Sequence, residues 1–302
     1  MEERGPILLN NMEERIQLEV VREDGRSIEY IDNPSERVQL EVVKQRGSDI
    51  YYIKNPSLKV QLEAVRRDGN AIKFIKNPSE EVQIEAVRKY SYAIRYINNP
   101  SEQVQLEAVR RNGLVIECIK NASLKVQLEA VKQDAYSIQF LSNLSEQAYL
   151  EAVKQNGFSI QYIDNPSEEV QIEAAKQDGF IIQYIDNPSL EVQLEAIREN
   201  GFAIKYLNNP SEEVQLEALR QNGRVIQYIK NPTDYIKSIM DVIETSSRPI
   251  YVLHEPNKEP LFSVGCKFNI SKDYFIWRIY NKDGGLEENP YRQEYLDIIE
   301  RY

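Results

Sequence analysis

The chain has 302 residues, of which 41% are hydrophobic, and it carries 37 Lys and Arg against 48 Asp and Glu, a net charge of -11. The hydrophobic fraction is sufficient for a folded core. The acidic balance argues against a nucleic-acid partner that is held mainly through phosphate contacts.

Cysteine usage and hydropathy indicate the environment of the protein. The two cysteines, Cys118 and Cys266, lack a CxxC or Cys/His companion, so the sequence predicts neither a disulfide framework nor a zinc site. The N-terminal segment has acidic residues where a signal peptide has basic ones, and no apolar run is long enough to cross a bilayer. We therefore expect a cytoplasmic protein that is not bound to a membrane.

An Asn-Pro dipeptide recurs along the chain at intervals of 22 residues or a multiple of 22. Its asparagines are Asn33, Asn55, Asn77, Asn99, Asn165, Asn187, Asn209 and Asn231. The same register continues through Asn11, Asn121 and Asn143, where another residue replaces the proline. This self-similarity predicts ten uninterrupted repeats over residues 11–230, preceded by an N-terminal cap at residues 1–10. Position 1 of each repeat is its asparagine.

The first half of each repeat is predicted to be an α-helix of about three turns. In the repeat at residues 209–230, Pro210 disfavours helix at the preceding residue, and Ser211 is a suitable N-cap. Gly223 is expected to end the helix in the left-handed conformation. Between these signals the apolar residues fall on one face at helical spacing, namely Val214, Leu216, Ala218 and Leu219.

The segment after the glycine is predicted to be a second helix of about two turns. A β-strand is the alternative, because the length and apolar content of the segment would suit one. Ile226 and Ile229, spaced for a helical face, and the N-cap of the following repeat favour the helix. Since helices this short are unstable alone in water, each repeat must bury its apolar faces against its neighbours. The expected fold class is therefore an all-α solenoid of tandem helical repeats with two short helices in each.

Residues 231–302 depart from the repeat and are expected to form a capping helix and a small α+β module. The expected elements are a helix over residues 231–245, paired strands over residues 250–254 and 261–269, a helix from Ser271 through Tyr280, and a final helix after Pro290. Trp277 is expected to belong to the core of this module.

His254 and Cys266 both lie in the C-terminal module and are the one candidate pair for nucleophilic catalysis. No third group that would orient them is evident, and no helix N-terminus directly follows Cys266. The sequence also contains no phosphate loop, metal-ligand cluster or nucleophile elbow. It therefore predicts a protein without a catalytic, cofactor or metal site.

Positions that hardly vary among the ten copies indicate what the fold requires. Position 18 is isoleucine in every copy, from Ile28 to Ile226, and position 20 is aromatic in all but one, so both are expected in the core. Glu at position 9 and Lys or Arg at position 12 occur in every copy and are expected to stabilise the stack through ion pairs, with a charged binding face as the alternative. The glutamine at position 7, such as Gln83, is expected to bond to an adjoining asparagine or to helix-end backbone rather than to a ligand.

Position 16 differs from the others because it is polar in the repeats at both ends and apolar in the six central ones. The outer repeats tolerate Ser48 or Arg224 there, so a large apolar group is not needed for folding. We expect the central residues to form a ridge exposed along one edge, with a packing contact beyond the helix end as the alternative. The candidate partner-binding residues are Tyr92, Leu114, Tyr136, Phe158, Phe180 and Phe202.

The pattern NPS-x-x-VQLEAV followed by G-x-x-I-x-Y-I resembles short HEAT-like repeats, in particular leucine-rich-repeat-variant units, over residues 11–230. It is also similar to the uncharacterised A-V-x-x-x-G-x-A-I repeats of phage and giant-virus proteins. The resemblance implies a protein-binding scaffold or inhibitor. The viral similarity implies a protein that binds and blocks a host factor, such as a defence protein.

Two alternative functions stay open at this point. Some HEAT-like solenoids resemble nucleic-acid repair glycosylases, which hold DNA in a basic groove that this sequence lacks. The other alternative is an acidic mimic of DNA, although a net charge of -11 is modest and every repeat contains Lys or Arg. The expected partner is a protein and not a nucleic acid, and a homo-oligomer is among the arrangements that the sequence permits.

Overall fold

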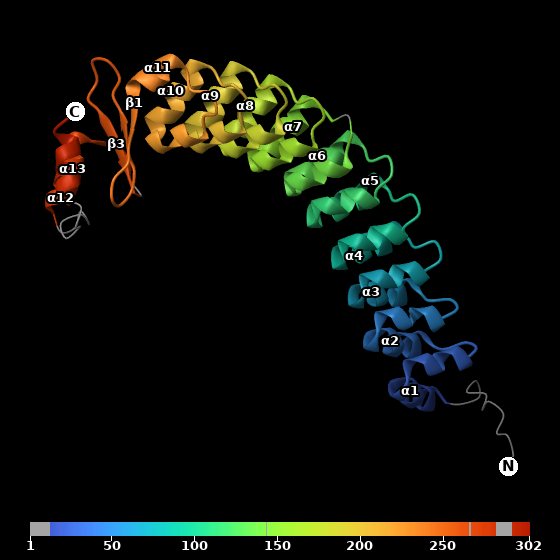
Figure 1. Ribbon diagram of the computed structural model, residues 1–302. Helices are drawn as coiled ribbons and strands as arrows, with labels where there is room; N and C mark the ends of the chain where they lie inside the picture. The colour runs from blue at the N-terminus through green and yellow to red at the C-terminus, as the bar shows by residue number, and fades with distance from the viewer. Residues whose placement is uncertain (1–12, 143, 266, 282–291) are drawn as a thin grey trace, which may run out of the picture. The chain divides into compact units, whose positions relative to one another are not determined.

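The computed structural model describes residues 13–142, 144–265, 267–281 and 292–302. The chain forms two compact units, Met1–Ala152 and Val153–Tyr302, with the boundary inside the seventh repeat. Within each unit the helix pairs follow one another in chain order, as Figure 1 shows for α1 to α6 and for α8 to α10. The predicted N-terminal cap at residues 1–10 lies outside the described residues.

Each repeat contains one α-helix of ten residues followed by one 3-10 helix of six residues. The α-helices are α1 (Glu14–Glu23), α2 (Glu36–Gln45), α3 (Leu58–Arg67), α4 (Glu80–Lys89), α5 (Glu102–Arg111), α6 (Leu124–Gln133), α7 (Glu146–Gln155), α8 (Glu168–Gln177), α9 (Leu190–Glu199) and α10 (Glu212–Gln221). The 3-10 helices are η2 (Gly25–Tyr30), η3 (Gly47–Tyr52), η4 (Gly69–Phe74), η5 (Ser91–Tyr96), η6 (Gly113–Cys118), η7 (Ala135–Phe140), η8 (Gly157–Tyr162), η9 (Gly179–Tyr184), η10 (Gly201–Tyr206) and η11 (Gly223–Tyr228). The prediction of two helices per repeat is confirmed, and the strand alternative is wrong for the described part of residues 13–230.

Serine at position 3 begins the α-helices as predicted. At the start of α2, Ser35 Oγ accepts a hydrogen bond from the Val38 N–H (3.4 Å) and so satisfies one donor of the first turn. The same bond forms at Ser57, Ser79, Ser101, Ser123, Ser167, Ser189 and Ser211. In several repeats the asparagine before the proline adopts the left-handed backbone conformation, with φ of 52° at Asn209. This conformation reverses the chain between one repeat and the next.

The glycine at position 15 does not end the α-helix in the left-handed conformation, so that prediction is wrong. Among the described glycines, only Gly265 has a positive φ. The α-helix ends instead at an extended residue at position 14, such as Asp178, whose side chain accepts the Phe180 N–H (2.7 Å). At Gly179 the packing between repeats favours glycine, because a Cβ there would lie 2.2 Å from the carbonyl oxygen of Ala196 in the next repeat. Other repeats accommodate Ser91 and Ala135 at this position.

The core of the solenoid consists of the position 18 isoleucines and the inner faces of the α-helices. The α-helix positions 6, 10 and 11 are fully buried, as Val192, Ala196 and Ile197 are in α9. Ile226 is half-buried, whereas the other position 18 isoleucines are at most 2% exposed, namely Ile28, Ile50, Ile72, Ile94, Ile116, Ile138, Ile160, Ile182 and Ile204. The prediction that this column belongs to the core is confirmed.

The repeated polar positions form structural bonds. Gln39 Nε2 donates to the carbonyl oxygen of Pro34 (3.0 Å), just before the helix N-cap, and equivalent bonds recur at Gln61, Gln83, Gln105, Gln127, Gln171, Gln193 and Gln215. The helix-end backbone is therefore the partner of this glutamine, as predicted. In the first unit Arg88 Nε donates to Glu107 of the next repeat (2.9 Å), and the pairs Arg22–Glu41, Arg66–Glu85 and Arg110–Glu129 repeat this contact. In the first unit the charged face at positions 9 and 12 thus forms an ion-pair ladder between repeats, whereas Glu173–Lys176 and Glu195–Arg198 pair within one repeat.

Two buried hydroxyl groups in the 3-10 helices have no hydrogen-bond partner among the described residues. They are Ser137 Oγ and Ser159 Oγ, at position 17, where six other repeats have Ala, Val or Ile. Burying a hydroxyl without a partner is unfavourable. We expect Ser159→Ala to raise the free energy of unfolding by about 1 kcal/mol, measured by urea denaturation. The same change at the half-buried Ser27 is the control, and equal effects at the two positions would contradict the explanation.

The C-terminal module contains a short α-helix and a four-stranded sheet. The helix α11 (Asp234–Ile239) is much shorter than the predicted residues 231–245, because strand β1 (Met240–Ile243) follows it directly. The other strands are β2 (Ile250–Leu253), β3 (Leu261–Val264) and β4 (Lys267–Ser271), and all neighbours pair antiparallel in chain order. The predicted strand over residues 261–269 is therefore two strands with a turn at Gly265, whereas its pairing with residues 250–254 is confirmed.

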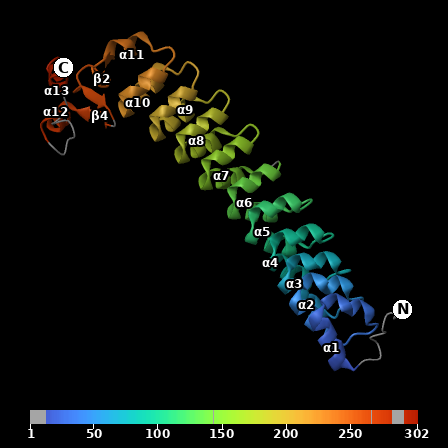
Figure 2. The same cartoon turned by 60° about the horizontal axis from the view of Figure 1, so that its bottom comes forward.

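The sheet lies between the last repeat and two further helices (Figure 2). Helix α12 (Lys272–Tyr280) begins at the N-cap Ser271, as predicted, and α13 (Arg292–Ile299) is the described part of the final helix. These helices cover one face of the sheet around Phe262, Phe275 and Tyr295, all of which are buried. None of the described helices has the length and apolar character that crossing a bilayer requires.

The other face of the sheet closes the end of the solenoid. Asn269 Nδ2 donates to the carbonyl oxygen of Leu219 (2.8 Å), near the end of α10, while its Oδ1 accepts the Gly223 N–H (3.0 Å). Glu255 is 9% exposed and forms a bidentate ion pair with Arg220, which holds the pKa of this carboxyl below its ordinary value. The module therefore satisfies backbone groups that an eleventh repeat would otherwise cover.

Candidate functional site

The position 16 residues lie on the second residue of each 3-10 helix and are partly accessible. Phe158, Phe180 and Phe202 are half-buried, as are Tyr92 and Leu114. Tyr136, the sixth candidate, is 37% exposed. None of these six side chains belongs to the fully buried core, so each has a surface that a partner could contact.

Most of the aromatic residues at position 20 are exposed, so their predicted place in the core is wrong, whereas Tyr52 and Phe74 are half-buried and pack against the core. Tyr184, Tyr206 and Tyr228 are between 37% and 43% exposed, and Tyr30 is 60% exposed. The reason is the spacing from the buried isoleucine. Position 20 follows position 18 by two residues, so on a helix with three to about 3.6 residues per turn its side chain points to a different side. Whether the aromatic residue at position 20 is buried therefore does not follow from the burial of the isoleucine at position 18.

Positions 16 and 20 meet between consecutive repeats of the second unit. The ring of Phe158 contacts that of Tyr184 edge to face, with centroids 6.0 Å apart and planes at 75°. The same contact follows at 5.9 Å between Phe180 and Tyr206 and at 5.8 Å between Phe202 and Tyr228. Such pairs contribute beyond their buried area and restrain both rings. We call these six residues the aromatic row.

Cationic side chains lie over several of these rings. Lys205 Nζ is 4.9 Å from the centroid of Phe180 and 4.6 Å from that of Tyr206, so it covers part of the aromatic row. In the first unit, Lys73 Nζ is 4.7 Å from the Phe74 ring, and the Arg95 guanidinium is 5.1 Å from the Tyr92 ring. These contacts hold the cations at the surface while leaving their hydrogen-bond donors available.

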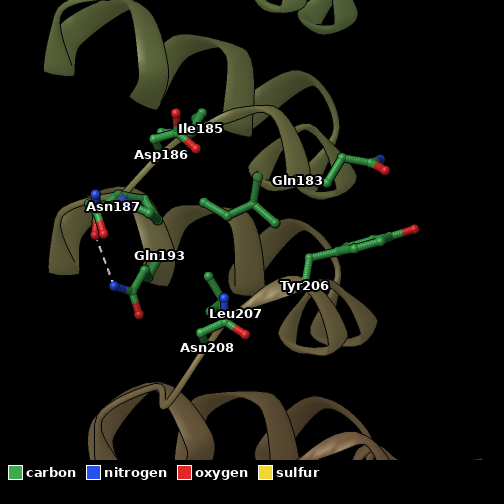
Figure 3. Close-up of a pocket in the computed structure, with 10 residues that line it drawn as sticks. Gln183, Ile185, Asp186, Asn187, Gln193, Tyr206, Leu207 and Asn208 are labelled. Atoms are coloured by element: carbon green, nitrogen blue, oxygen red, sulfur yellow. Dashed lines mark hydrogen bonds between the residues drawn. The ribbon is translucent and has the colours of Figure 1, made fainter.

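A groove borders the aromatic row where the end of one repeat meets the Asn-Pro loop and the 3-10 helix of the next (Figure 3). It has a volume of about 400 Å³ and is lined by Ile182, Gln183, Ile185, Asp186, Asn187, Pro188, Gln193, Tyr206, Leu207 and Asn208. Gln193 Nε2 donates to the carbonyl oxygen of Pro188 (2.9 Å), which holds the amide in the wall. Because Tyr206 also belongs to the aromatic row, the row and the groove form one surface.

The groove recurs with the repeat. Equivalent positions in the first unit line a groove of about 160 Å³ beside Tyr52 and one of about 770 Å³ between Tyr51 and Lys76. In each groove the Asn-Pro loop, the position 7 glutamine and the position 20 aromatic residue come from one repeat, and the end of the preceding repeat forms the other wall. A repeated groove of one chemistry is suited to a ligand that extends along the solenoid.

The C-terminal module brings together side chains that the sequence did not link. His254 Nε2 lies 3.1 Å from Asp241 Oδ2, and the Tyr302 hydroxyl donates to the same carboxylate. Burial and, to a lesser extent, this bond raise the pKa of Tyr302 to about 12. Cys266 lies outside the described residues. Trp277 is 43% exposed and stacks on Tyr274, so its predicted core position is wrong.

Residues 125–166 match the model of a family described as a domain of unknown function, DUF4116. The match runs from position 5 of the sixth repeat to position 2 of the eighth, so it covers slightly less than two repeat lengths of the solenoid. No curated protein and no solved structure matches the chain. Within the described ranges, no three His, Cys, Asp or Glu side chains are grouped as metal ligands would be.

Proposed function

We propose that the chain is a protein-binding scaffold, and that the aromatic row and the groove beside it bind an extended segment of a partner protein. The observation that carries this proposal is the row itself. Its tyrosines keep about two fifths of their surface exposed although each is packed against a phenylalanine of the preceding repeat. An inhibitor of a host protein would use the same surface to occupy that protein's own binding segment.

Restrained aromatic rings are effective binding groups. A single exposed apolar side chain is ordinary on a protein surface, but a continuous row is unusual and is typical of interaction surfaces. Tyrosine is enriched among the residues that dominate interfaces because it offers a large contact area with few rotatable bonds. The edge-to-face contacts reduce the rotational freedom that Tyr184, Tyr206 and Tyr228 would lose on binding.

The groove supplies the polar half of the surface. An extended polypeptide must find partners for its N–H and C=O groups when it leaves water. The side chains of Gln183, Asp186 and Asn208 line the groove and can donate or accept such bonds, while Ile185 and Leu207 provide apolar contact. We therefore expect the partner segment to place its backbone at the groove and its apolar side chains on the rings.

The charge distribution favours this proposal over a DNA mimic. A mimic needs an acidic face without nearby cations, whereas the position 9 glutamates pair with position 12 cations, as Glu195 does with Arg198 and Glu173 with Lys176. Binding through an apolar row depends weakly on salt, whereas binding through a charged mimic weakens steeply.

The test begins with linear peptides selected by display on the immobilised full chain, whose affinity is then measured by fluorescence anisotropy. We expect Phe158→Ser, Phe180→Ser and Phe202→Ser together to weaken binding by at least about tenfold, because truncating an aromatic anchor costs about 2 kcal/mol or more. Serine is the residue that the second repeat uses at Ser48.

A second variant distinguishes a loss of binding from a loss of folding. Changing the more exposed Tyr184, Tyr206 and Tyr228 to Ser should also remove binding while lowering the melting temperature less than the phenylalanine changes. The matched control changes the exposed Glu169, Glu191 and Glu213 of the same repeats to Gln and should leave affinity unchanged. Full binding by the tyrosine variant, or steep weakening of the wild-type complex by salt, would refute a partner site on the aromatic row.

A further inference from the structure

A separate pocket lies where the C-terminal module meets the last repeat, and two arginines line it. Its volume is about 280 Å³, and the lining residues are Arg224, Arg248, Pro249, Tyr251 and Gly265. Arg224 occupies position 16 of the tenth repeat, where the preceding three repeats carry the phenylalanines of the aromatic row. The row is thus replaced at this end of the solenoid by a cationic side chain.

Both arginines are held in place by the module. Arg224 Nη1 donates to the carbonyl oxygen of Gly265 (3.2 Å), and its guanidinium lies 5.9 Å from the ring of Phe268. Arg248 belongs to the β1–β2 loop, in which Thr245 Oγ1 accepts the Arg248 N–H (3.0 Å) and donates to the Arg248 carbonyl oxygen (2.7 Å). The two guanidinium groups therefore reach one pocket from different elements.

Gly265 forms the turn that lies between the two arginine side chains. Its φ is 60°, a conformation that other residues rarely adopt, and a Cβ there would lie 3.4 Å from Arg248 Nη1. The left-handed backbone at Gly265 thus forms the turn between β3 and β4, which lies beside Arg248 and presents a carbonyl to Arg224.

The charges of the pocket are unbalanced. Among the described residues, neither Arg224 nor Arg248 lies within 4.0 Å of a carboxylate, although the chain has a net charge of -11. The neighbouring Arg220 shows the contrast, because it is paired with Glu255. Two cations that line one small pocket repel each other, and an oxyanion between them would remove this repulsion and accept several N–H donors.

We propose that this pocket binds a phosphate group. The planar guanidinium groups match the oxygens of a phosphate, and their number matches the double negative charge of a phosphate monoester. The site is separate from the aromatic row and does not depend on the proposed partner. A free phosphate ion and a phosphorylated side chain share the chemistry that the pocket would recognise.

The experiment titrates the full chain with inorganic phosphate by calorimetry, with chloride adjusted to keep the ionic strength constant. We expect saturable binding to the wild type and at least about tenfold weaker binding to Arg248→Gln, because a charge-assisted bidentate contact is lost. Arg248 lies in an exposed loop, so this variant is expected to fold. Arg224→Gln should have the same effect, and Arg198→Gln, in the preceding repeat, is the control that should not weaken binding.

A parallel titration with O-phosphoserine identifies the source of the group. Tighter binding of phosphoserine than of phosphate points to a modified side chain, and the reverse order points to the free ion. Either order supports the site provided that Arg248→Gln weakens binding of the ligand at least about tenfold. The proposal is overturned if the wild type binds neither ligand saturably at constant ionic strength, or if the Arg248 variant binds both as tightly as the wild type.

Discussion

Ile182→Ala is expected to lower the free energy of unfolding by about 2 to 5 kcal/mol, the range for truncating a buried isoleucine. The side chain is 2% exposed and lies on the buried face of η9. Neighbours in the stack can close the cavity only in part, because each repeat is already close-packed against the next. Urea denaturation followed by circular dichroism measures the change.

Ile182→Val is the graded control and should cost only about 0.5 to 1.5 kcal/mol, since one methyl group is removed. The loss at Ile182→Ala should also reach the adjoining helices α8 and α9 as faster amide hydrogen exchange, because each repeat is stabilised mainly by its neighbours. A melting temperature unchanged within about one degree would place Ile182 outside the core.

Gly179→Ala is expected to lower the free energy of unfolding by about 1 to 3 kcal/mol, as overpacking of a tight contact does. The added methyl group would lie 2.2 Å from the Ala196 carbonyl oxygen, which is backbone and cannot rotate away. The two repeats would have to separate, and the spacing between Phe180 and Tyr206 in the aromatic row would change with them.

Gly201→Ala is the matched control at the same position of the following repeat. Its methyl group would lie 3.2 Å from the Ala218 carbonyl oxygen, so the neighbours need to move only slightly. Neither glycine has a positive φ, so the backbone preference for alanine is the same at both. We expect Gly201→Ala to change stability by less than about 1 kcal/mol. Equal effects of the two substitutions would show that close approach does not explain the glycines.

Local signals in the sequence determined the repeat and its first helix. The Asn-Pro spacing, the serine N-caps and the 3.6-residue periodicity all act within one repeat, and each was found where predicted, as at Ser211 and Val214. The isoleucine at position 18 was equally clear, because ten internal copies separate what the fold requires from what varies. The register and the core column are therefore readable without coordinates.

The surface was decided by tertiary structure. Whether position 20 is core or exposed depends on which sides of the second helix the neighbouring repeats cover, and the sequence of η9 does not show this. The candidate residues at position 16 were found by their variation along the chain. Their partners at position 20, such as Tyr206 for Phe180, became visible only when consecutive repeats were stacked.

The role of Gly179 and the arginine pocket of the C-terminal module were likewise decided by tertiary structure and not by local sequence. From its residue type, Gly179 was interpreted as the end of a helix. The structure shows instead that a side chain there would collide with a carbonyl oxygen of the next repeat. Likewise, Arg224 and Arg248 are separated by a helix and a strand in the sequence, and only the folding of β3 and β4 against the last repeat brings them to one pocket. Helix starts and core columns are encoded by short-range residue patterns, whereas the aromatic row and the arginine pocket arise from contacts between segments whose spacing and orientation are set by packing.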